Sequence, residues 1–316
     1  MADKKIIAVI GATGAQGDGL VRAILADPQG GFAVRAITRS PESAAATALA
    51  DAGAGIVAAD VDDVESLKQA FAGAYGAYCV TFFWDHLSVD KEQAQVRNMA
   101  EAAKAAALQH VIWSTLEDTR NYVALDDDRM PTLQGKYKVP HFDGKGEADA
   151  DFTEAGVPTT FLLASFYWDN FIHFGSGPKQ GPDGDYLLTF PIGNVPMAGV
   201  AAQDIGGVAY GILKEGTAMV GQRIGVAGEH LTGEQMAAAM SKALGKTVRY
   251  NEVTPDAYRS LGFPGADDLG NMFQFYRDFP EVCNTMRDVA RSRRLHPALQ
   301  SFDTWLAGNG SKVPLD

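Results

Sequence analysis

The sequence predicts an α/β fold, a doubly wound parallel sheet with helices on both faces, followed by a second, smaller α+β lobe towards the C-terminus. Apolar strand-like segments alternate with alanine-rich amphipathic segments through the first half of the chain, a pattern typical of a parallel sheet. After Leu163 this alternation stops, and glycine- and proline-rich segments follow, which favour loops and short strands. We therefore expect two structural parts.

The elements are expected in a regular order. Strands should lie near residues 5–10, 33–38, 55–59, 76–82, 110–115 and 158–163, and helices near residues 15–27, 42–53, 63–73, 88–108 and 141–155. Because each helix follows a strand, right-handed crossovers should wind a parallel sheet. A helix near 203–215 and a strand near 222–227 should return to this sheet, while helices near 232–244 and 255–261 and the Phe-rich region 270–307 should complete the smaller lobe.

The first predicted strand runs directly into three glycines that are three residues apart. Gly11 allows a tight turn, Gly14 lets the backbone approach a pyrophosphate, and Gly17 lets the next helix pack closely on the sheet. That helix, from about Gln16 to Leu25, directs its amides and the positive end of its dipole at the phosphates. The segment therefore predicts a dinucleotide-binding turn of the Rossmann type.

The second predicted strand ends at Thr38-Arg39-Ser40, where the adenine ribose of a dinucleotide would lie. Folds that select NAD place Asp or Glu there to hold the 2′-hydroxyl. A guanidinium can instead pair with a 2′-phosphate and stack on adenine. Arg39 therefore predicts NADP(H) as the cofactor; the alternative is a solvated surface arginine.

These features divide the chain into two parts. We expect residues 1–163 to form an NADP-binding Rossmann domain, with 199–228 returning to its sheet. Residues 164–198 and 229–316 should form the smaller substrate or regulatory lobe. The length of 316 residues, with 46% hydrophobic residues, is ample for such a core.

Composition limits the partners. The formal net charge of −12 repels a phosphate backbone, so we expect no direct nucleic-acid binding. No apolar run is long enough for a signal-peptide core or a bilayer span, which predicts a cytoplasmic protein with no membrane contact. Two cysteines and six scattered histidines give no ligand spacing, so no metal is expected.

Catalytic residues are expected on the strand that ends at Ser114 and on the helix after it. In reductases of this architecture the strand delivers a hydroxyl, and the helix delivers a Tyr-x-x-x-Lys pair whose members share a face. Here the helix begins His141-Phe142-Asp143-Gly144-Lys145, so the lysine is present and His141 replaces the tyrosine. A formal Tyr-x-x-x-Lys at Tyr210–Lys214 follows the sixth strand and is interpreted as coincidence.

Several segments resemble the NmrA-like family of atypical short-chain dehydrogenase/reductases. They are Gly-Ala-Thr-Gly-Ala-Gln-Gly at 11–17, Thr38-Arg39, His-Phe-Asp-Gly-Lys-Gly-Glu at 141–147, 191–197, Gly-Phe-Pro-Gly-Ala at 262–266 and Asn-Met-Phe at 271–273. The resemblance covers nearly the whole chain. It implies NADP(H) binding on a Rossmann domain, with a smaller C-terminal lobe closing the cleft.

The resemblance also implies the cofactor contacts. They would fall on Gly11, Thr13, Gly14, Ala15, Gln16, Gly17, Arg39, Asp60, Val61, Thr81, Phe82, Phe83 and Lys145, with Phe166 and Tyr167 flanking the nicotinamide. After Arg39 the chain lacks the further basic residues that some relatives have, which bears on the strength of the NADP preference.

Two functions agree with these residues, because the family includes regulators and NADPH sensors as well as reductases of quinones and dyes. The first is an NADPH-dependent oxidoreductase acting on a small-molecule electrophile of the quinone, enone, imine or dye type, with His141 as proton donor or as a structural residue. The second is a redox sensor in which NADPH occupancy changes the binding of a protein partner. The oligomeric state stays open, with a dimer plausible.

Overall fold

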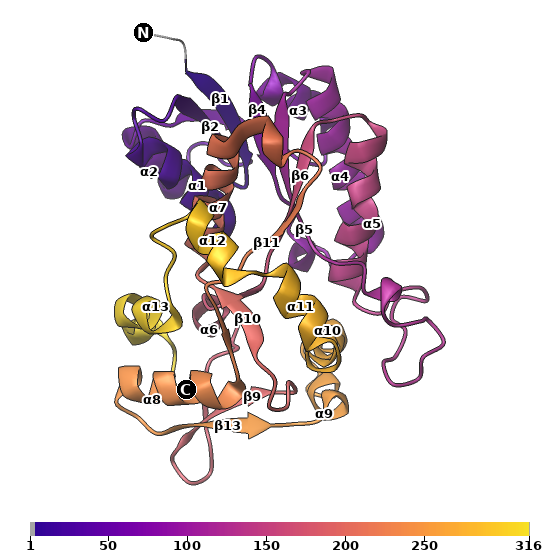
Figure 1. Ribbon diagram of the computed structural model, residues 1–316, viewed down its shortest axis with the longest axis vertical. Coiled ribbons are helices and arrows are strands. Elements are labelled where there is room, and N and C mark those ends of the chain that lie inside the picture. The colour runs from indigo at the N-terminus through magenta and orange to yellow at the C-terminus, as the bar shows by residue number, and fades with distance from the viewer. Residues whose placement is uncertain (1–3, 316) are drawn as a thin grey trace.

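A computed structural model describes residues 4–315 of the chain. Its central sheet has seven strands in the order β11-β6-β5-β4-β1-β2-β3 (Figure 1). They are β1 (Lys5–Ile10), β2 (Phe32–Thr38), β3 (Gly55–Ala58), β4 (Gly76–Cys79), β5 (His110–Thr115), β6 (Thr159–Leu163) and β11 (Arg223–Gly225). Every neighbouring pair is parallel. The predicted doubly wound sheet is thus confirmed.

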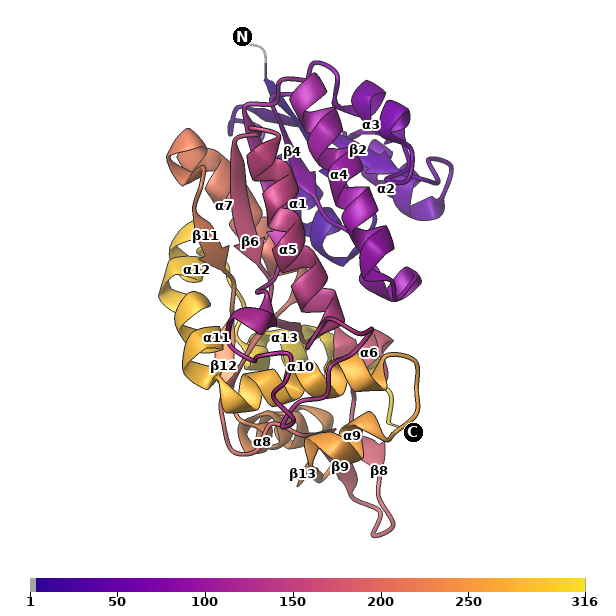
Figure 2. The same ribbon diagram turned by 90° about the vertical axis from the view of Figure 1, so that its right-hand side faces the viewer.

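Helices cover both faces of this sheet (Figure 2). On one face lie α1 (Ala15–Ala26) and α7 (Ala202–Glu215), and on the other α3 (Val64–Phe71), α4 (Val89–Ala105) and α5 (Pro140–Glu154), with α2 (Ala44–Asp51) beside β2 and β3. Apolar side chains such as Ile24 and Ile205 fill the first interface, and Met99 and Phe152 the second. Within residues 4–315, no helix combines the length and apolar character that a membrane span requires.

Glycines bring α1 and α7 into backbone contact. A Cβ at Gly19 would lie 2.2 Å from the carbonyl oxygen of Gln203, and a Cβ at Gly206 would lie 2.1 Å from the amide nitrogen of Leu20. No side chain fits at either position, because real Cβ contacts do not come this close. The contact fixes the segment from Ala202 onward against the first helix of the chain.

The smaller lobe contains two three-stranded sheets and a set of helices. One sheet has the order β12 (Glu229–Leu231), β10 (Met197–Val200), β7 (Phe166–Tyr167), and the other β13 (Val248–Glu252), β9 (Tyr186–Phe190), β8 (Lys179–Gln180). The helices are α6 (Asn170–His173), α8 (Gly233–Leu244), α9 (Pro255–Arg259), α10 (Ala266–Asp278), α11 (Pro280–Met286) and α13 (Phe302–Asn309), while α12 (Val289–Leu295) lies against α7. The predicted smaller α+β lobe is confirmed.

The structure differs from the expectation for residues 199–228. Strand β10 begins this segment but pairs with β7 and β12 rather than with the central sheet. Trp168, directly after β7, packs on this strand so closely that a Cβ at Gly199 would lie 2.3 Å from its indole nitrogen. Only α7 and β11 return to the central sheet.

A buried ion pair fastens the C-terminal helices to the strand ends. The guanidinium of Arg287, between α11 and α12, is fully buried and pairs with both carboxylate oxygens of Glu117, which follows β5. Its Nε also donates to the carbonyl oxygen of Ala164 at the end of β6, at 2.9 Å. Such a pair tolerates burial only because each charge finds its partner.

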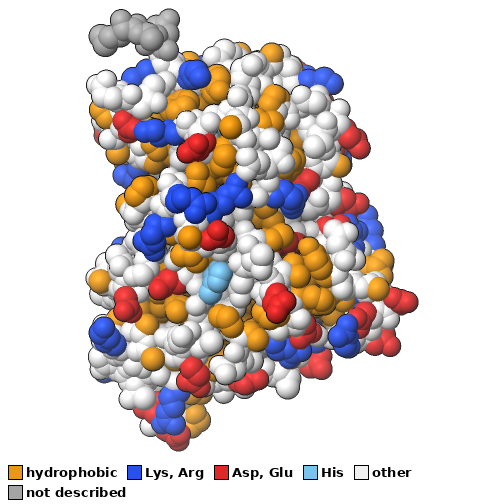
Figure 3. Space-filling view, viewed as in Figure 1, with side chains coloured by type: hydrophobic (Ala, Val, Ile, Leu, Met, Phe, Trp, Pro, Cys, Tyr) orange, Lys and Arg blue, Asp and Glu red, His pale blue; other side chains and the backbone are white. Residues whose placement is uncertain are grey.

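A band of Lys and Arg side chains crosses the middle of the face seen in Figure 3, over α12. Arg291 donates to the side-chain oxygen of Gln222 at 2.5 Å, and Arg293 donates to the carbonyl oxygen of Leu299 at 3.1 Å. These two cations therefore hold α12 against neighbouring segments.

We expect Glu117→Gln to lower the free energy of unfolding by about 3–5 kcal/mol, because the Arg287 charge would stay buried without its counter-charge. Urea unfolding followed by circular dichroism measures this loss. As a control, Glu65→Gln breaks the exposed Glu65–Lys68 pair of 2.8 Å and should cost less than about 1 kcal/mol. Equal losses in the two variants would show that the buried pair does not fasten the lobe.

Candidate functional site

The turn after β1 has the geometry that its three glycines predict. Gly11 adopts a φ of 64°, in the left-handed region that glycine tolerates. The amide of Gly14 donates to the carbonyl oxygen of Gly11 at 2.8 Å. A Cβ at Gly17 would lie 2.2 Å from that same oxygen. The first helix thus starts in backbone contact with the turn.

Helix α1 begins without a side-chain cap. In α2, α3 and α4 the side chains of Ser43, Asp63 and Ser88 accept first-turn amides, whereas the N-cap of α1 is Gly14, which has no side chain. Gly14 and its neighbours Thr13 and Ala15 are exposed. Uncapped amides at a helix N-terminus, beside the carboxyl ends of parallel strands, fit a pyrophosphate.

Arg39 extends into solvent directly after β2. The nearest acidic group is Asp85, at the end of the short helix η1 (Phe83–Asp85), with its Oδ2 3.7 Å from Nη1 of Arg39. The two side chains are 67% and 59% exposed, so a ligand phosphate can reach the guanidinium. The Asp85 carboxylate competes with that phosphate, and sequence analysis did not identify it.

Asp60 and Val61 lie in the loop after β3, the strand next to β2. The amide of Asp60 donates to the hydroxyl of Ser66 at 3.0 Å, and the carbonyl oxygen of Val61 accepts from the side chain of Asn98 at 2.9 Å. Both residues are half-buried. The loop is therefore held at the same sheet edge as Arg39.

Lys145 lies in a buried charge cluster rather than free in a cleft. Its Nζ is 2.7 Å from Oε1 of Glu92 on α4, and it also donates to the hydroxyl and, at 3.4 Å, to the carbonyl oxygen of Thr81. The Thr81 hydroxyl donates to Glu92 at 2.6 Å. Nε2 of His86 lies 3.5 Å from the other Glu92 oxygen. Lys145 thereby fixes the segment that follows β4.

Glu92 is ionised in this cluster although its side chain is fully buried. Burial alone would raise its pKa, but the charge of Lys145, the His86 ring nitrogen 3.5 Å away and hydrogen bonds from Lys145 and Thr81 outweigh burial and lower the pKa to about 2. Sequence analysis missed Glu92. A signal was present, because Glu92 shares the apolar face of its helix with Val89, Val96 and Met99, and a carboxylate there needs a buried partner.

His141 forms a pair with a carboxylate from the smaller lobe. Its Nδ1 lies 2.5 Å from Oδ1 of Asp268 on α10, and its backbone amide donates to Oδ2 at 3.1 Å. The imidazole is nearly buried, with the ring of Trp84 centred 4.8 Å away and that of Phe83 5.9 Å away. Sequence analysis also missed Asp268. Acidic residues are common in the first turn of a helix, and no local pattern indicates that this one pairs with a histidine.

A second set of contacts joins Gln16 to Tyr167. The Gln16 amide donates to the Tyr167 hydroxyl and accepts from Tyr78, which lies within hydrogen-bonding reach of Ser114. Burial raises the pKa of Tyr167 to about 12. Within residues 4–315, no described contact joins Ser114 to His141 or Lys145.

The aromatic residues expected near the cofactor separate into different environments. Phe83 packs beside His141, while Phe166 lies in the aromatic core of the lobe, with the ring of Phe171 centred 5.4 Å away and that of Phe190 5.7 Å away. Phe82 is instead 54% exposed. Tyr210 and Lys214, the formal Tyr-x-x-x-Lys pair, both bond Asp27 and so connect α7 to the end of α1.

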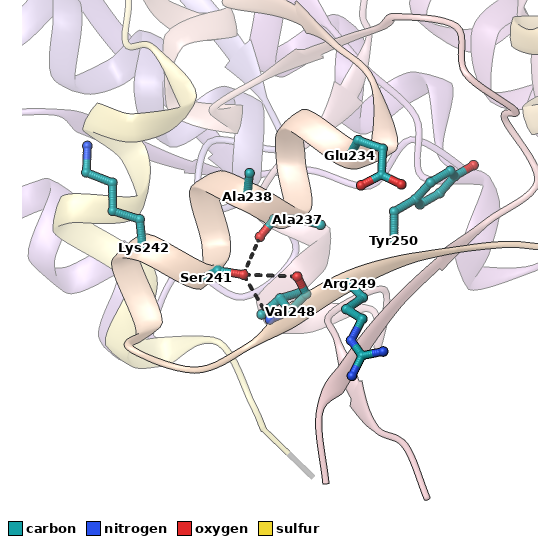
Figure 4. A pocket seen from close by; sticks show the side chains of 8 residues that line it. All are labelled: Glu234, Ala237, Ala238, Ser241, Lys242, Val248, Arg249 and Tyr250. Atoms are coloured by element: carbon teal, nitrogen blue, oxygen red, sulfur yellow. Dashed lines mark hydrogen bonds between the residues drawn. The ribbon is translucent and has the colours of Figure 1, made fainter. Parts of the chain in front are cut away.

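A separate groove lies between α8 and β13 on the smaller lobe (Figure 4). Its central hydroxyl, Ser241, already bonds the backbone of Val248 and Ala237 at 2.9 Å. The groove contains none of the predicted site residues, so we assign the candidate site to the carboxyl ends of the central strands.

Comparisons with known proteins identify the family of the chain. The profile of the NmrA-like family matches residues 3–306. The NmrA-like family domain-containing oxidoreductase FrzB of a Cladobotryum species is 29% identical, over 85% of this chain and 83% of FrzB. The crystal structure of NmrA, a negative transcriptional regulator, in complex with NADP is similar with a TM-score of 0.78 and 25% identity, covering 96% of this chain and 95% of NmrA.

Other solved structures show the same fold. NmrA has also been crystallised in complex with NAD, and that structure gives a TM-score of 0.79 at 25% identity, over 96% of this chain and 95% of NmrA. A triphenylmethane reductase from Citrobacter sp., complexed with NADP(H), gives a TM-score of 0.74 at 19% identity, over 96% of this chain and 99% of the reductase. At that identity the likeness concerns the fold alone.

We expect Arg39→Ala to weaken NADPH binding by about 1.5–3 kcal/mol and to change NADH binding little, because only NADPH has the 2′-phosphate. Asp85→Asn should act in the opposite direction and strengthen NADPH binding by up to about 1 kcal/mol, since it removes an exposed competing carboxylate. Calorimetric titration of both cofactors measures both effects. Equal changes for the two cofactors would mean that Arg39 does not contact the phosphate.

Glu92 should make the free energy of unfolding depend on pH in the acidic range. Its pKa is 4.5 in the unfolded chain and about 2 in the fold, so the unfolded chain takes up the proton first as the pH falls. The contribution of ionised Glu92 is present above about pH 4.5 and is lost towards about pH 2. Glu92→Gln should flatten this part of the profile and lower stability at neutral pH. Urea unfolding between these pH values tests it; an unchanged slope would contradict the ionised state.

Proposed function

The chain belongs to the NmrA-like family, and we propose that it is an NADP(H)-dependent oxidoreductase that reduces a small electrophile of the quinone, enone, imine or dye type. NADP(H) as the cofactor is compatible with the structures of NmrA, which has been crystallised with NAD and with NADP. The oxidoreductase class is supported by relatives such as FrzB. The substrate type rests on the arrangement of this chain's own residues.

Residues along the strand ends would hold the cofactor. The amides of the turn at 11–17 would bind the pyrophosphate, Arg39 the 2′-phosphate, and Lys145 with Thr81 the nicotinamide ribose. Bound NADPH supplies a hydride for an electrophilic carbon of the acceptor. Because Lys145 is already paired with Glu92, its role is to orient groups rather than to donate a proton.

The observation that carries this proposal is the His141–Asp268 pair. His141 and Lys145 are four residues apart on α5 and share a face of the helix. The carboxylate at Nδ1 fixes the orientation of the ring and leaves Nε2 as the nitrogen that can carry a proton to the acceptor. Asp268 also stabilises the protonated imidazole, as a carboxylate does for a histidine in acid–base catalysis.

The pair also accounts for the absence of the usual tyrosine. The imidazole donates from Nδ1 to the Asp268 carboxylate and keeps Nε2 for the acceptor, whereas a phenol has a single O–H and could not serve both. An imidazole nitrogen can supply a proton to an oxygen or nitrogen that becomes negative. Quinone, enone and iminium acceptors need less assistance than simple ketones.

A second candidate is a redox sensor, and one contact favours it. Gln16 of the cofactor turn bonds Tyr167 of the smaller lobe, so occupancy of the turn and the position of the lobe can influence each other. A sensor requires different cofactor affinities in two conformations. A protein partner would then bind one of these conformations.

We expect His141→Phe to keep NADPH affinity but to reduce the turnover rate with an enone about 10²- to 10⁴-fold. Asp268→Asn keeps the imidazole but removes the carboxylate that orients it, so turnover should fall here too while NADPH affinity stays unchanged. NADPH oxidation measured across pH tests both variants. If the wild type reduces no quinone, enone, imine or dye, while NADPH changes proteolysis of residues 119–139, the sensor function replaces the reductase.

A further inference from the structure

The groove between α8 and β13 borders a free edge of a sheet. Strand β13 is the outer strand of its sheet, and β9 is its only strand partner within residues 4–315. Helix α8 lies beside it at the lower end of the molecule in Figure 1. The groove between them has a volume of about 730 Å³, within the range of about 300–1,000 Å³ that ligand sites occupy. An outer strand offers N–H and C=O groups to another chain.

The backbone groups of β13 point in two directions. The carbonyl oxygen of Thr247 and the amide of Val253 bond to the backbone of β9, at 2.9 and 3.4 Å. Alternate residues of a strand face the same neighbouring strand. Val248, Tyr250 and Glu252 therefore turn their N–H and C=O groups away from β9, towards the free edge.

Helix α8 closes the first of these positions and leaves the others open. The Ser241 hydroxyl donates to the carbonyl oxygen of Val248 and accepts from its amide, both at 2.9 Å (Figure 4). In the part of the chain that the structure describes, no hydrogen bond engages the backbone groups of Tyr250 or Glu252. The edge is thus free from Tyr250 onward, a length that about three residues of an extended chain would cover.

The α8 side of the groove suits a long cationic side chain. Glu234, Ala237, Ala238 and Ser241 line the groove and, at this spacing, share one face of the helix. The two alanine methyl groups leave room for a hydrocarbon stem, and the Glu234 carboxylate lies beyond them, near the Tyr250 ring in Figure 4. Lysine and arginine place their stems on apolar surface and keep their charged heads in a polar environment.

The charges at the free end of the groove are acidic. Burial, together with the charges of Glu252 and Glu234, raises the pKa of the Tyr250 phenol to about 12, so both carboxylates lie close to it. Of the two cations that line the groove, Arg249 pairs with an aspartate, and Lys242 points away from Tyr250 in Figure 4. The chain has a formal net charge of −12, so a basic segment is attracted and a second copy of this chain is repelled.

We propose that this groove binds an extended basic segment of a partner protein, which joins β13 as an additional strand and places a lysine or arginine side chain against Glu234. Main-chain hydrogen bonds to Tyr250 and Glu252 hold the segment, and the α8 side of the groove selects its side chains. The groove contains none of the residues assigned to the cofactor, so this inference does not depend on the proposed reductase function.

The test is calorimetric titration of the whole chain with the peptide Thr-Lys-Val-Arg-Thr-Ser, blocked by acetyl and amide groups. We expect Glu234→Gln to weaken peptide binding about two- to fivefold, because it removes one exposed ion pair. Ala238→Phe should weaken it at least about tenfold, because the ring fills the groove; Ala238 is exposed, so the core is not disturbed. NADP⁺ affinity should be unchanged in both variants and reports that they are folded.

Glu215→Gln is the matched control, because it removes an exposed carboxylate at the end of α7, outside the groove. It should leave peptide binding unchanged. Equal losses in Glu215→Gln and Glu234→Gln would show that the net charge alone attracts the peptide, and would overturn the proposal. No binding by the wild type would overturn it too, as would a dimer that Ala238→Phe converts to a monomer, which would assign the groove to a contact between two copies.

Two N-methylated peptides of the same charge test the strand pairing itself. One carries the methyl groups on the lysine and arginine amides, and the other on the amides of valine and the second threonine. Only one edge of an added strand faces β13. We therefore expect one of these peptides to bind at least about tenfold more weakly and the other to bind like the parent peptide. Equal affinities of the two methylated peptides would overturn the pairing.

Discussion

The buried ion pair between Glu92 and Lys145 fixes the segment 80–88, on which most of the candidate site depends. The Thr81 hydroxyl bonds both members of the pair, and this contact sets the position of the residues that follow Thr81. Phe83 and Trp84 pack on His141, and Asp85 approaches Arg39. A largely buried charge pair that shifted would leave an ion poorly solvated, so the pair restrains this short segment.

The smaller lobe is attached to the sheet at the site itself. The contacts that cross between the parts include Gln16 with Tyr167, Glu117 with Arg287, and His141 with Asp268. Each involves a polar group that is buried or nearly buried, which makes the interface dependent on geometry as well as on apolar area. Consequently, the lobe supplies polar side chains to the strand ends and does more than cover them.

Short-range patterns located most elements to within a few residues, and the deviations have physical causes. The strand expected at 76–82 ends at Cys79, because the chain leaves the sheet to bring Thr81 to Lys145. Strand β9 pairs in parallel with β13, joining residues 186–190 to residues 248–252. No local periodicity indicates a pairing over that distance, so the sheets of the lobe could only be expected as short strands.

The sequence by itself determined the doubly wound sheet, the glycine turn, and the positions of Arg39, His141 and Lys145, because these follow from local periodicity and backbone freedom. Only the tertiary structure decided their partners. Asp268 is 127 residues from His141, and sequence reasoning did not name Glu92 or Asp85 as residues of the site. Which charges meet depends on how whole elements pack, and that packing is set by the summed burial of the core rather than by any local pattern.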